Sequence, residues 1–358
     1  MKKLIALLIA AMALAGCSSA PATPSATPAA SETPAATGAL KVGIGSVTTL
    51  SVADATADAE GKAQFNTTYA TVVLEGDVIK YVSIDTAQNT GKFSTAGAVT
   101  APEDITKTPT KKEKGADYGM LSASEIGKEW FEQIAAFEEY AVGKTVAELA
   151  AMPTLDKGDG NHTAVPDVEE LKTSVTMTVG DYIKAVEVAA ANAQEVEGVA
   201  QVGTGSFTSL STADATADKD GQFQANTSFA VVALDADGKI VFTNIDTAQN
   251  SVKFSTAGAV TAPEDITKTP TKKEKGADYG MLSASEIGKE WFEQIAAFEA
   301  YTVGKTVAEV IEMPTFDKGD GNHTAVPEVE ELKSSVTMTV GDYLKALSIA
   351  ANNLTEIK

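Results

Sequence analysis

Residue types that commonly carry out chemistry are scarce in this chain of 358 residues. It has one cysteine, Cys17, and two histidines, His162 and His323, which stand in matching Asp-Gly-Asn-His-Thr-Ala-Val-Pro segments. One histidine per segment, with no cysteine beside it, cannot supply the ligands of a zinc site, so we expect no metal centre. The chain has no Gly-x-Ser-x-Gly motif, and its two repeated histidine loops argue against a hydrolase. The histidines therefore predict polar surface loops.

Two hydroxyl-rich segments contain threonines to which a cofactor could be attached. Glu170-Leu-Lys-Thr-Ser-Val-Thr176 recurs later in the chain as Glu331-Leu-Lys-Ser-Ser-Val-Thr337. By spacing alone, residues 174–178 alternate polar and apolar types, which predicts an edge strand with Val175 and Met177 facing a core. A structural strand and a modified threonine are thus two alternatives for the same residues.

The first of these segments resembles the acceptor motif of the covalent FMN-binding domain family, which runs Asp-x-x-Ser/Thr-Gly-Ala-Thr. Here Glu170 stands for the aspartate and Ser174-Val175 stand for Gly-Ala. In that family a separate FMN transferase joins the flavin phosphate to the last threonine as a phosphoester. The family includes two-domain extracellular electron-transfer lipoproteins of Gram-positive bacteria. The resemblance therefore implies covalent FMN on Thr176 and Thr337.

A second part of the resemblance lies earlier in each copy. Asp117-Tyr-Gly-Met120 precedes Trp130, and the same residues recur at Asp278 to Met281. In the FMN-binding domains an acidic, glycine-containing loop precedes a helix and lies beside the flavin ring. The resemblance implies that the ring contacts Tyr118, Gly119, Met120, Tyr279, Gly280 and Met281. Under it, hydrogen bonding to or stacking on a flavin becomes the alternative role of His162 and His323.

Glycine pairs in two further segments indicate other nucleotide sites only weakly. Gly43-x-Gly45 and Gly203-x-Gly205 lack the third glycine of a dinucleotide-binding fingerprint. Gly97-Ala-Val-Thr100 competes as a flavin acceptor, but it has one residue too many before the threonine and no acid at the required place. The acceptor prediction therefore stays with Thr176 and Thr337.

The N-terminal residues have the pattern of an exported lipoprotein. Lys2 and Lys3 precede an apolar run that is too short to span a bilayer, and Leu14-Ala-Gly-Cys17 is similar to a bacterial lipobox. We expect residues 1–17 to be a signal peptide and Cys17 to carry the lipid that anchors the protein on the extracytoplasmic face of the cell membrane. An ordinary signal peptide is the alternative. Residues 18–38, rich in Pro, Ala, Ser and Thr, predict a tether.

A tandem duplication organises the rest of the chain. Residues 92–138 recur without a change as residues 253–299. The two copies are offset by 161 residues, and repeat units of about that length are too long for a solenoid. We expect two globular domains, at residues 39–196 and 199–358, each FMN-binding-like by the resemblance above.

The elements that must position the candidate residues predict an α+β fold. Residues 65–74 and 78–85 alternate apolar and polar types around a Glu-Gly-Asp turn, which indicates a β-hairpin. Ser122-Ala-Ser-Glu125 has the form of a capping box and opens an amphipathic helix to about Tyr140, with Trp130 in the core. Shorter helical patterns begin at Thr145 and at Val179. Each domain is therefore expected to be a small mixed or antiparallel sheet with packed helices.

The charge of the chain excludes some classes of partner. It has 49 acidic residues against 28 basic ones, all of them lysine, for a net charge of −21. Nucleic-acid binding needs clustered cations and is not expected. Lys111, Lys112 and Lys114 come closest to a basic cluster and predict a solvated loop.

Taken with the resemblance, these features predict a membrane-anchored extracytoplasmic flavoprotein with covalent FMN in each domain. It would relay electrons from a membrane donor, such as a quinone-linked dehydrogenase, to extracellular acceptors. We expect an electron carrier rather than an enzyme with its own substrate. The alternative is a cofactor-free surface lipoprotein with two adhesive or ligand-binding modules.

Overall fold

A computed structural model describes residues 39–101, 105–106, 108–261 and 269–358. Chain contacts divide the protein into Met1–Thr37 and one compact unit, Gly38–Lys358. The predicted signal peptide, the lipidated Cys17 and the tether at 18–38 lie outside the described residues. None of the helices in the described part is long and apolar enough to cross a membrane.

The first half of the compact unit is built on an antiparallel sheet with the strand order β4-β3-β2-β1-β7. Its strands are β1 (Leu40–Ala53), β2 (Gly61–Glu75), β3 (Val78–Phe93), β4 (Val99–Ala101) and β7 (Gln194–Val196). The predicted hairpin is confirmed as β2 and β3, and Gly76 takes the positive φ of 63° that its turn needs. Both strands extend further than the alternating pattern indicated.

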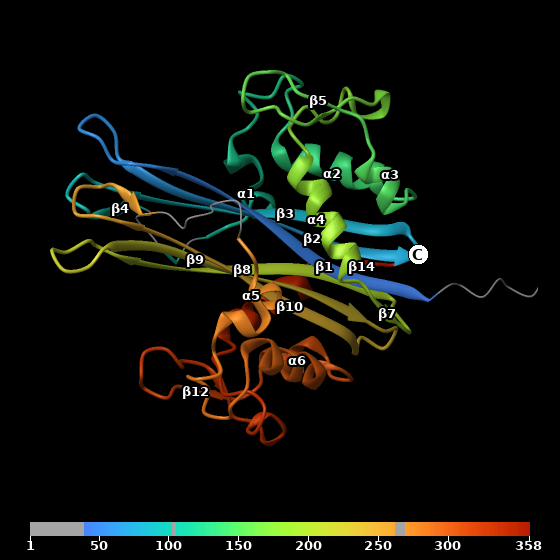
Figure 1. Cartoon of the computed structure of the whole chain (residues 1–358). Helices are drawn as coiled ribbons and strands as arrows, with labels where there is room; N and C mark the ends of the chain where they lie inside the picture. Colours follow the sequence, from blue (N-terminus) through green and yellow to red (C-terminus); the bar gives the residue numbers. More distant parts are fainter. Residues whose placement is uncertain (1–38, 102–104, 107, 262–268) are drawn as a thin grey trace, which may run out of the picture. The chain divides into compact units, whose positions relative to one another are not determined.

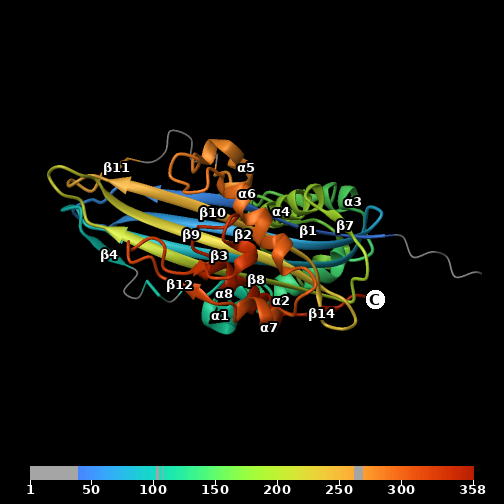
Figure 2. The ribbon, with the colours of Figure 1, turned by 90° about the horizontal axis from the view of Figure 1, so that it is seen from below.

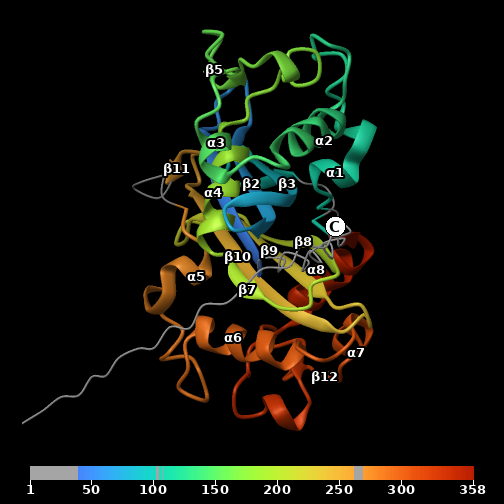
Figure 3. The same cartoon turned by 90° about the vertical axis from the view of Figure 1, so that its right-hand side faces the viewer.

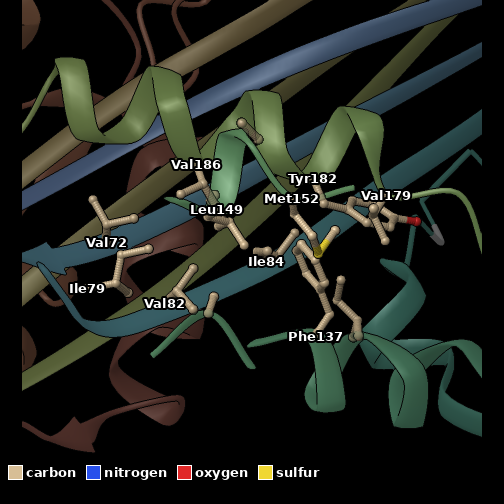
Figure 4. Close-up of a cluster of buried hydrophobic side chains, with 14 of the residues drawn as sticks. Val72, Ile79, Val82, Ile84, Phe137, Leu149, Met152, Val179, Tyr182 and Val186 are labelled. Carbon is tan, nitrogen blue, oxygen red and sulfur yellow. The ribbon is translucent and has the colours of Figure 1, made fainter. Parts of the chain in front are cut away.

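Helices cover one face of this sheet. They are α1 (Lys111–Lys114), η1 (Gly115–Tyr118), α2 (Trp130–Ala141), α3 (Val146–Ala150), η2 (Glu169–Leu171) and α4 (Gly180–Ala191). A small ladder of β5 (Thr154–Leu155) and β6 (Val165–Pro166) lies between α3 and η2. Val72, Ile84, Phe137, Val179 and Val186 form part of the core between helices and sheet (Figure 4). Trp130 is buried in this core, as predicted.

Two sequence predictions about these elements are wrong. Helix α2 begins at Trp130 rather than after Ser122, because Gly127 has a φ of 63° that no α-helix allows. Its capping box is made by Glu129 and Glu132. Residues 174–178 form no strand but an irregular segment before α4, although Val175 and Met177 are buried as the alternation required.

The second half repeats this order. Its sheet contains β8 (Gln201–Ala213), β9 (Gly221–Leu234), β10 (Ile240–Phe254), β11 (Val260–Thr261) and β14 (Thr355–Glu356). Its helices are α5 (Lys272–Lys275), η3 (Gly276–Tyr279), α6 (Trp291–Thr302), α7 (Val307–Ile311), η4 (Glu330–Leu332) and α8 (Gly341–Asn352). Its small ladder is β12 (Thr315–Phe316) with β13 (Val326–Pro327). The protein thus has an α+β fold of two tandem, similar halves, as predicted.

The two sheets pack against each other through the faces that the helices leave open. Aromatic rings stack across this interface: Phe65 on Phe223, Tyr69 on Phe229 and Phe93 on Phe254, with centroid distances of 5.8, 5.9 and 4.1 Å. Figure 3 shows α1–α4 on one side of the paired sheets and α5–α8 on the other, and Figure 1 shows the same separation for α1–α4 and α6. Figure 2 shows the long strands of both sheets running in similar directions. The two repeats therefore share a core between their sheets.

Strand β1 was not predicted, because its glycines and small polar residues have low strand propensity. Its glycines allow α4 to approach closely. A Cβ on Gly43 would lie 2.1 Å from the Ala189 carbonyl oxygen, and one on Gly45 would lie 2.5 Å from the Ala189 nitrogen. The glycine pair that weakly resembled a nucleotide fingerprint is thus a helix-packing surface.

We expect Gly43→Ala to lower the free energy of unfolding by about 2–3 kcal/mol, because the clash is with backbone that cannot rotate away. Gly180→Ala is the matched control, since its new Cβ would meet only Ala164 at an ordinary 3.6 Å. Urea unfolding of both variants checks the prediction. Equal stabilities of the two would contradict it.

Candidate functional site

The predicted acceptor Thr176 lies in the irregular segment between η2 and α4. Its side chain is partly exposed between the buried Val175 and Met177. The backbone N–H groups of Thr176 and Met177 donate to Gln133 Oε1, at 2.9 and 3.3 Å. In the second half the N–H of Thr337 donates to Gln294 Oε1 at 2.9 Å. In a β-strand these backbone N–H groups would bond to a neighbouring strand. Here they bond to the side chain of a buried glutamine instead.

The predicted ring-contact loop is held by a carboxylate at the start of α2. Helix η1 ends at Tyr118, and Gly119 has the left-handed φ of 78° that favours glycine. The N–H groups of Met120 and Leu121 donate to the two oxygens of Glu129, at 2.8 and 3.0 Å. The second half repeats this arrangement, with Glu290 binding the N–H groups of Met281 and Leu282 after Gly280.

The acceptor segment and the ring-contact loop therefore meet at the N-terminal end of α2. Glu129 and Gln133 are four residues apart, so they lie one above the other on the same face of the helix. Gln133 also donates through Nε2 to Ser124 Oγ and to the Lys128 carbonyl oxygen, at 3.1 and 3.2 Å. Sequence reasoning missed both residues. One sequence feature could have indicated them: they are four residues apart, and they lie on the buried side of the helix next to Trp130.

A lysine lies over the aromatic rings beside this loop. Lys111 Nζ is 4.9 Å from the ring centroid of Tyr118 and 5.3 Å from that of Trp130, which are distances of cation–π contacts. Burial lowers the pKa of Lys111 to about 8, against the opposing effects of Asp85 and Asp181. Lys272 repeats both contacts in the second half. The prediction of a solvated loop for Lys111, Lys112 and Lys114 is wrong, because these residues belong to helix α1 and all three lysines are partly buried.

A polar cavity of about 500 Å³ lies next to the second acceptor segment. Thr339 and Gly341, which follow Thr337 in the chain, line it together with Lys272, Lys345 and hydroxyl side chains. Lys345 Nζ is 3.5 Å from Asp342 and 4.0 Å from the ring centroid of Phe207. The Asp342 carboxylate also lines the cavity, but the two ammonium groups outnumber it, which favours an anionic group such as a phosphate ester.

The histidines lie in exposed loops, in agreement with the sequence prediction. His162 Nδ1 is 2.6 Å from Asp159 Oδ2, and the N–H groups of Asn161 and His162 donate to the other oxygen of the same carboxylate. These hydrogen bonds hold the pKa of Asp159 well below its ordinary value. His323 and Asp320 repeat the arrangement. Across the described residues, no three His, Cys, Asp or Glu side chains converge as a metal site would require.

Comparison with known proteins gives one short similarity. No family model matches the chain, and no solved structure matches it. A stretch of 40 residues is 58% identical to part of the chlorophenol reductase of Desulfitobacterium hafniense. The matched stretch covers 11% of this chain and 12% of that protein. The comparisons therefore place the chain in no family, and a proposal about its function depends on the site itself.

Proposed function

We propose that the protein carries FMN covalently bound to Thr176 and Thr337 and relays electrons outside the membrane to which Cys17 anchors it. The supporting observation is the meeting of the two segments singled out by the resemblance at the start of α2, and equally of α6. Gln133 and Glu129 bring them together, although 55 residues lie between Met120 and Thr176 in the sequence.

The local structure fits an acceptor in three ways. The Thr176 hydroxyl makes no hydrogen bond to the described residues and Thr176 is partly exposed, so a transferase has access to it. In the second half the Thr337 hydroxyl makes one long hydrogen bond, of 3.5 Å, to Gln294 Oε1. The segment is irregular, so no sheet has to open for the enzyme to bind. In the second half, Lys272 and Lys345 border a cavity in which a phosphate could lie. Tyr279 and Met281 pack at the edge of the adjacent core and offer contact surface for a ring.

Attachment requires an activated flavin donor. The threonine hydroxyl loses its proton and forms the ester bond to phosphorus, while a phosphoanhydride bond of the donor breaks. An FMN transferase would catalyse this step. Bound FMN supplies the electron-transfer chemistry, and the protein holds and orients it. A membrane donor, such as a quinone-linked dehydrogenase, and an extracellular acceptor complete the proposed role.

Intact-mass measurement of the protein purified from its native membrane tests this proposal. We expect two added FMN masses, located on the peptides that contain Thr176 and Thr337. Thr176→Ala should remove one FMN and the double variant with Thr337→Ala should remove both. Thr173→Ala is the matched control, because it lies in the same segment and should retain both. An unmodified chain from cells that flavinylate another protein would overturn the proposal and favour the cofactor-free binding module.

A further inference from the structure

A second polar cavity lies between the two halves, away from both acceptor segments. Its volume is about 500 Å³, and it lies where the edge of β3 faces β8 and the C-terminal end of α8. We call it the β3–β8 cavity. The side chains used in the argument are Tyr69, Tyr81, Asp85, Lys112, Glu138 and Thr204. The volume lies in the range of small-molecule sites.

The β3–β8 cavity has more carboxylates than ammonium groups. Asp85 and Glu138 are both largely buried, Glu113 adds a third carboxylate, and Lys112 is the single lysine among the lining residues. Lys112 Nζ donates to Glu138 Oε1 at 2.6 Å, and the Lys112 N–H donates to Asp85 Oδ1 at 3.1 Å. Burial raises the pKa of both Asp85 and Glu138 above the ordinary carboxyl value. Buried carboxylates in excess are stabilised by an added cation.

Thr204 provides independent evidence for a ligand. Its side chain lines the cavity and is 6% exposed, and its Oγ1 has no hydrogen-bond partner among the described residues. A buried hydroxyl without a partner costs free energy, so a ligand that bonds to it is favoured. The second oxygen of Glu138 also accepts no hydrogen bond from the described part of the chain, because Ile84 N–H and Lys112 both bond to Oε1.

The duplication supplies an internal comparison. The charged residues Asp85, Lys112 and Glu138 recur as Asp246, Lys273 and Glu299 in the second half. Three hydroxyl side chains of the lining, those of Tyr69, Tyr81 and Thr204, are apolar in the other half. By repeat alignment, Ile44 matches Thr204, Phe229 matches Tyr69 and Phe242 matches Tyr81. The cavity therefore has hydroxyl groups at three positions whose equivalents on the other side of the sheet interface are apolar.

We propose that the β3–β8 cavity binds a short aliphatic amine in its cationic form. The ammonium group would donate to Glu138 and Thr204, and the tyrosine rings would contact the alkyl chain and the charge. A metal ion is a poorer match, because the lining carboxylates do not converge as a metal-binding group within the described residues. This site is separate from the proposed flavin sites and stands without them.

Isothermal titration of the full-length chain in detergent with 1,4-diaminobutane tests the proposal. Butane-1,4-diol is the control ligand of the same length without charge. We expect the diamine to bind saturably with a stoichiometry of one and the diol not to bind. The stoichiometry separates the site from general attraction of cations to a chain of net charge −21.

Matched variants locate the binding. Glu138→Gln keeps the acceptor for Ile84 N–H but removes a charge, and we expect it to weaken diamine binding at least about tenfold. Thr204→Ile, which copies the other half, should also weaken it. Glu299→Gln makes the same change at the repeated position and should leave binding unaltered. Absence of saturable binding by the folded wild type, equal binding of the diol, or equal loss in Glu299→Gln would overturn the proposal.

Discussion

Replacing Phe254 with alanine should lower the free energy of unfolding by about 3–5 kcal/mol. The ring of Phe254 is fully buried, and it stacks on Phe93 at a centroid distance of 4.1 Å with an interplanar angle of 2°. These two rings come from β10 and β3, in opposite halves of the chain. The substitution leaves a cavity between the sheets, so it removes both apolar burial and contact between the repeats.

Urea unfolding followed by tryptophan fluorescence checks this result, because one tryptophan is buried in each half, Trp130 in the first and Trp291 in the second. Phe316→Ala is the control. That ring is 40% exposed on the short strand β12, and its loss should change stability by less than about 0.5 kcal/mol. A change below about 1 kcal/mol for Phe254→Ala would show that the sheets do not depend on this contact.

Replacing Lys112 with methionine should lower the free energy of unfolding by about 2–3 kcal/mol near neutral pH. Lys112 is the ammonium partner of Glu138, whose side chain is 17% exposed, and the buried Asp85 lies beside it. Removing one partner of a largely buried pair leaves an uncompensated charge. The expected loss of stability is smaller than that for a fully buried ion pair, because the Lys112 side chain is 32% exposed.

The effect should depend on pH in a defined direction. Burial raises the pKa of Asp85 and Glu138, whereas Lys112 opposes that rise, so the variant raises both pKa values further. A carboxyl group with a raised folded-state pKa binds protons more tightly in the folded state. Its contribution to stability is therefore lost as the pH rises from the unfolded-state pKa through the folded-state pKa. Lys112→Met should be more destabilising at pH 8 than at pH 4.5.

Urea unfolding at the two pH values measures this dependence. Lys172→Met is the control, since the Lys172–Glu169 pair is exposed and should contribute nothing measurable at either pH. Lys273→Met tests the same arrangement in the second half, where Lys273 bonds to Glu299 at 2.6 Å. An identical loss of stability at pH 4.5 and pH 8 would contradict the role assigned to the carboxylates.

Local patterns in the sequence were sufficient for much of the fold. The hairpin of β2 and β3, the short capped helix α3 and the helix after Val179 all follow from signals within a few residues of each element. Two of the failures, at β1 and at residues 174–178, have one physical cause. Strand β1 depends on α4 packing onto its glycines, and residues 174–178 depend on the hydrogen bonds that their backbone N–H groups donate to Gln133 Oε1. In both cases the partner is distant in the sequence.

The candidate site shows the same division. The sequence was sufficient to single out Thr176 as a candidate acceptor and Tyr118 as a candidate ring contact. It did not indicate which side chains bring their two segments together. Glu129 and Gln133 are ordinary helix residues until the fold buries them against backbone N–H groups. The β3–β8 cavity was not foreseen at all, because it is formed by residues from both halves.

The sequence by itself determined the duplication, the α+β character of each half and the absence of a hydrolase or zinc motif. These properties depend on local periodicity and on residue types, which do not change when the chain folds. The tertiary structure decided which faces of the two sheets meet and which polar groups become buried. Those outcomes depend on contacts such as that of Phe93 with Phe254, which lie far apart in the sequence and form only when both halves are folded.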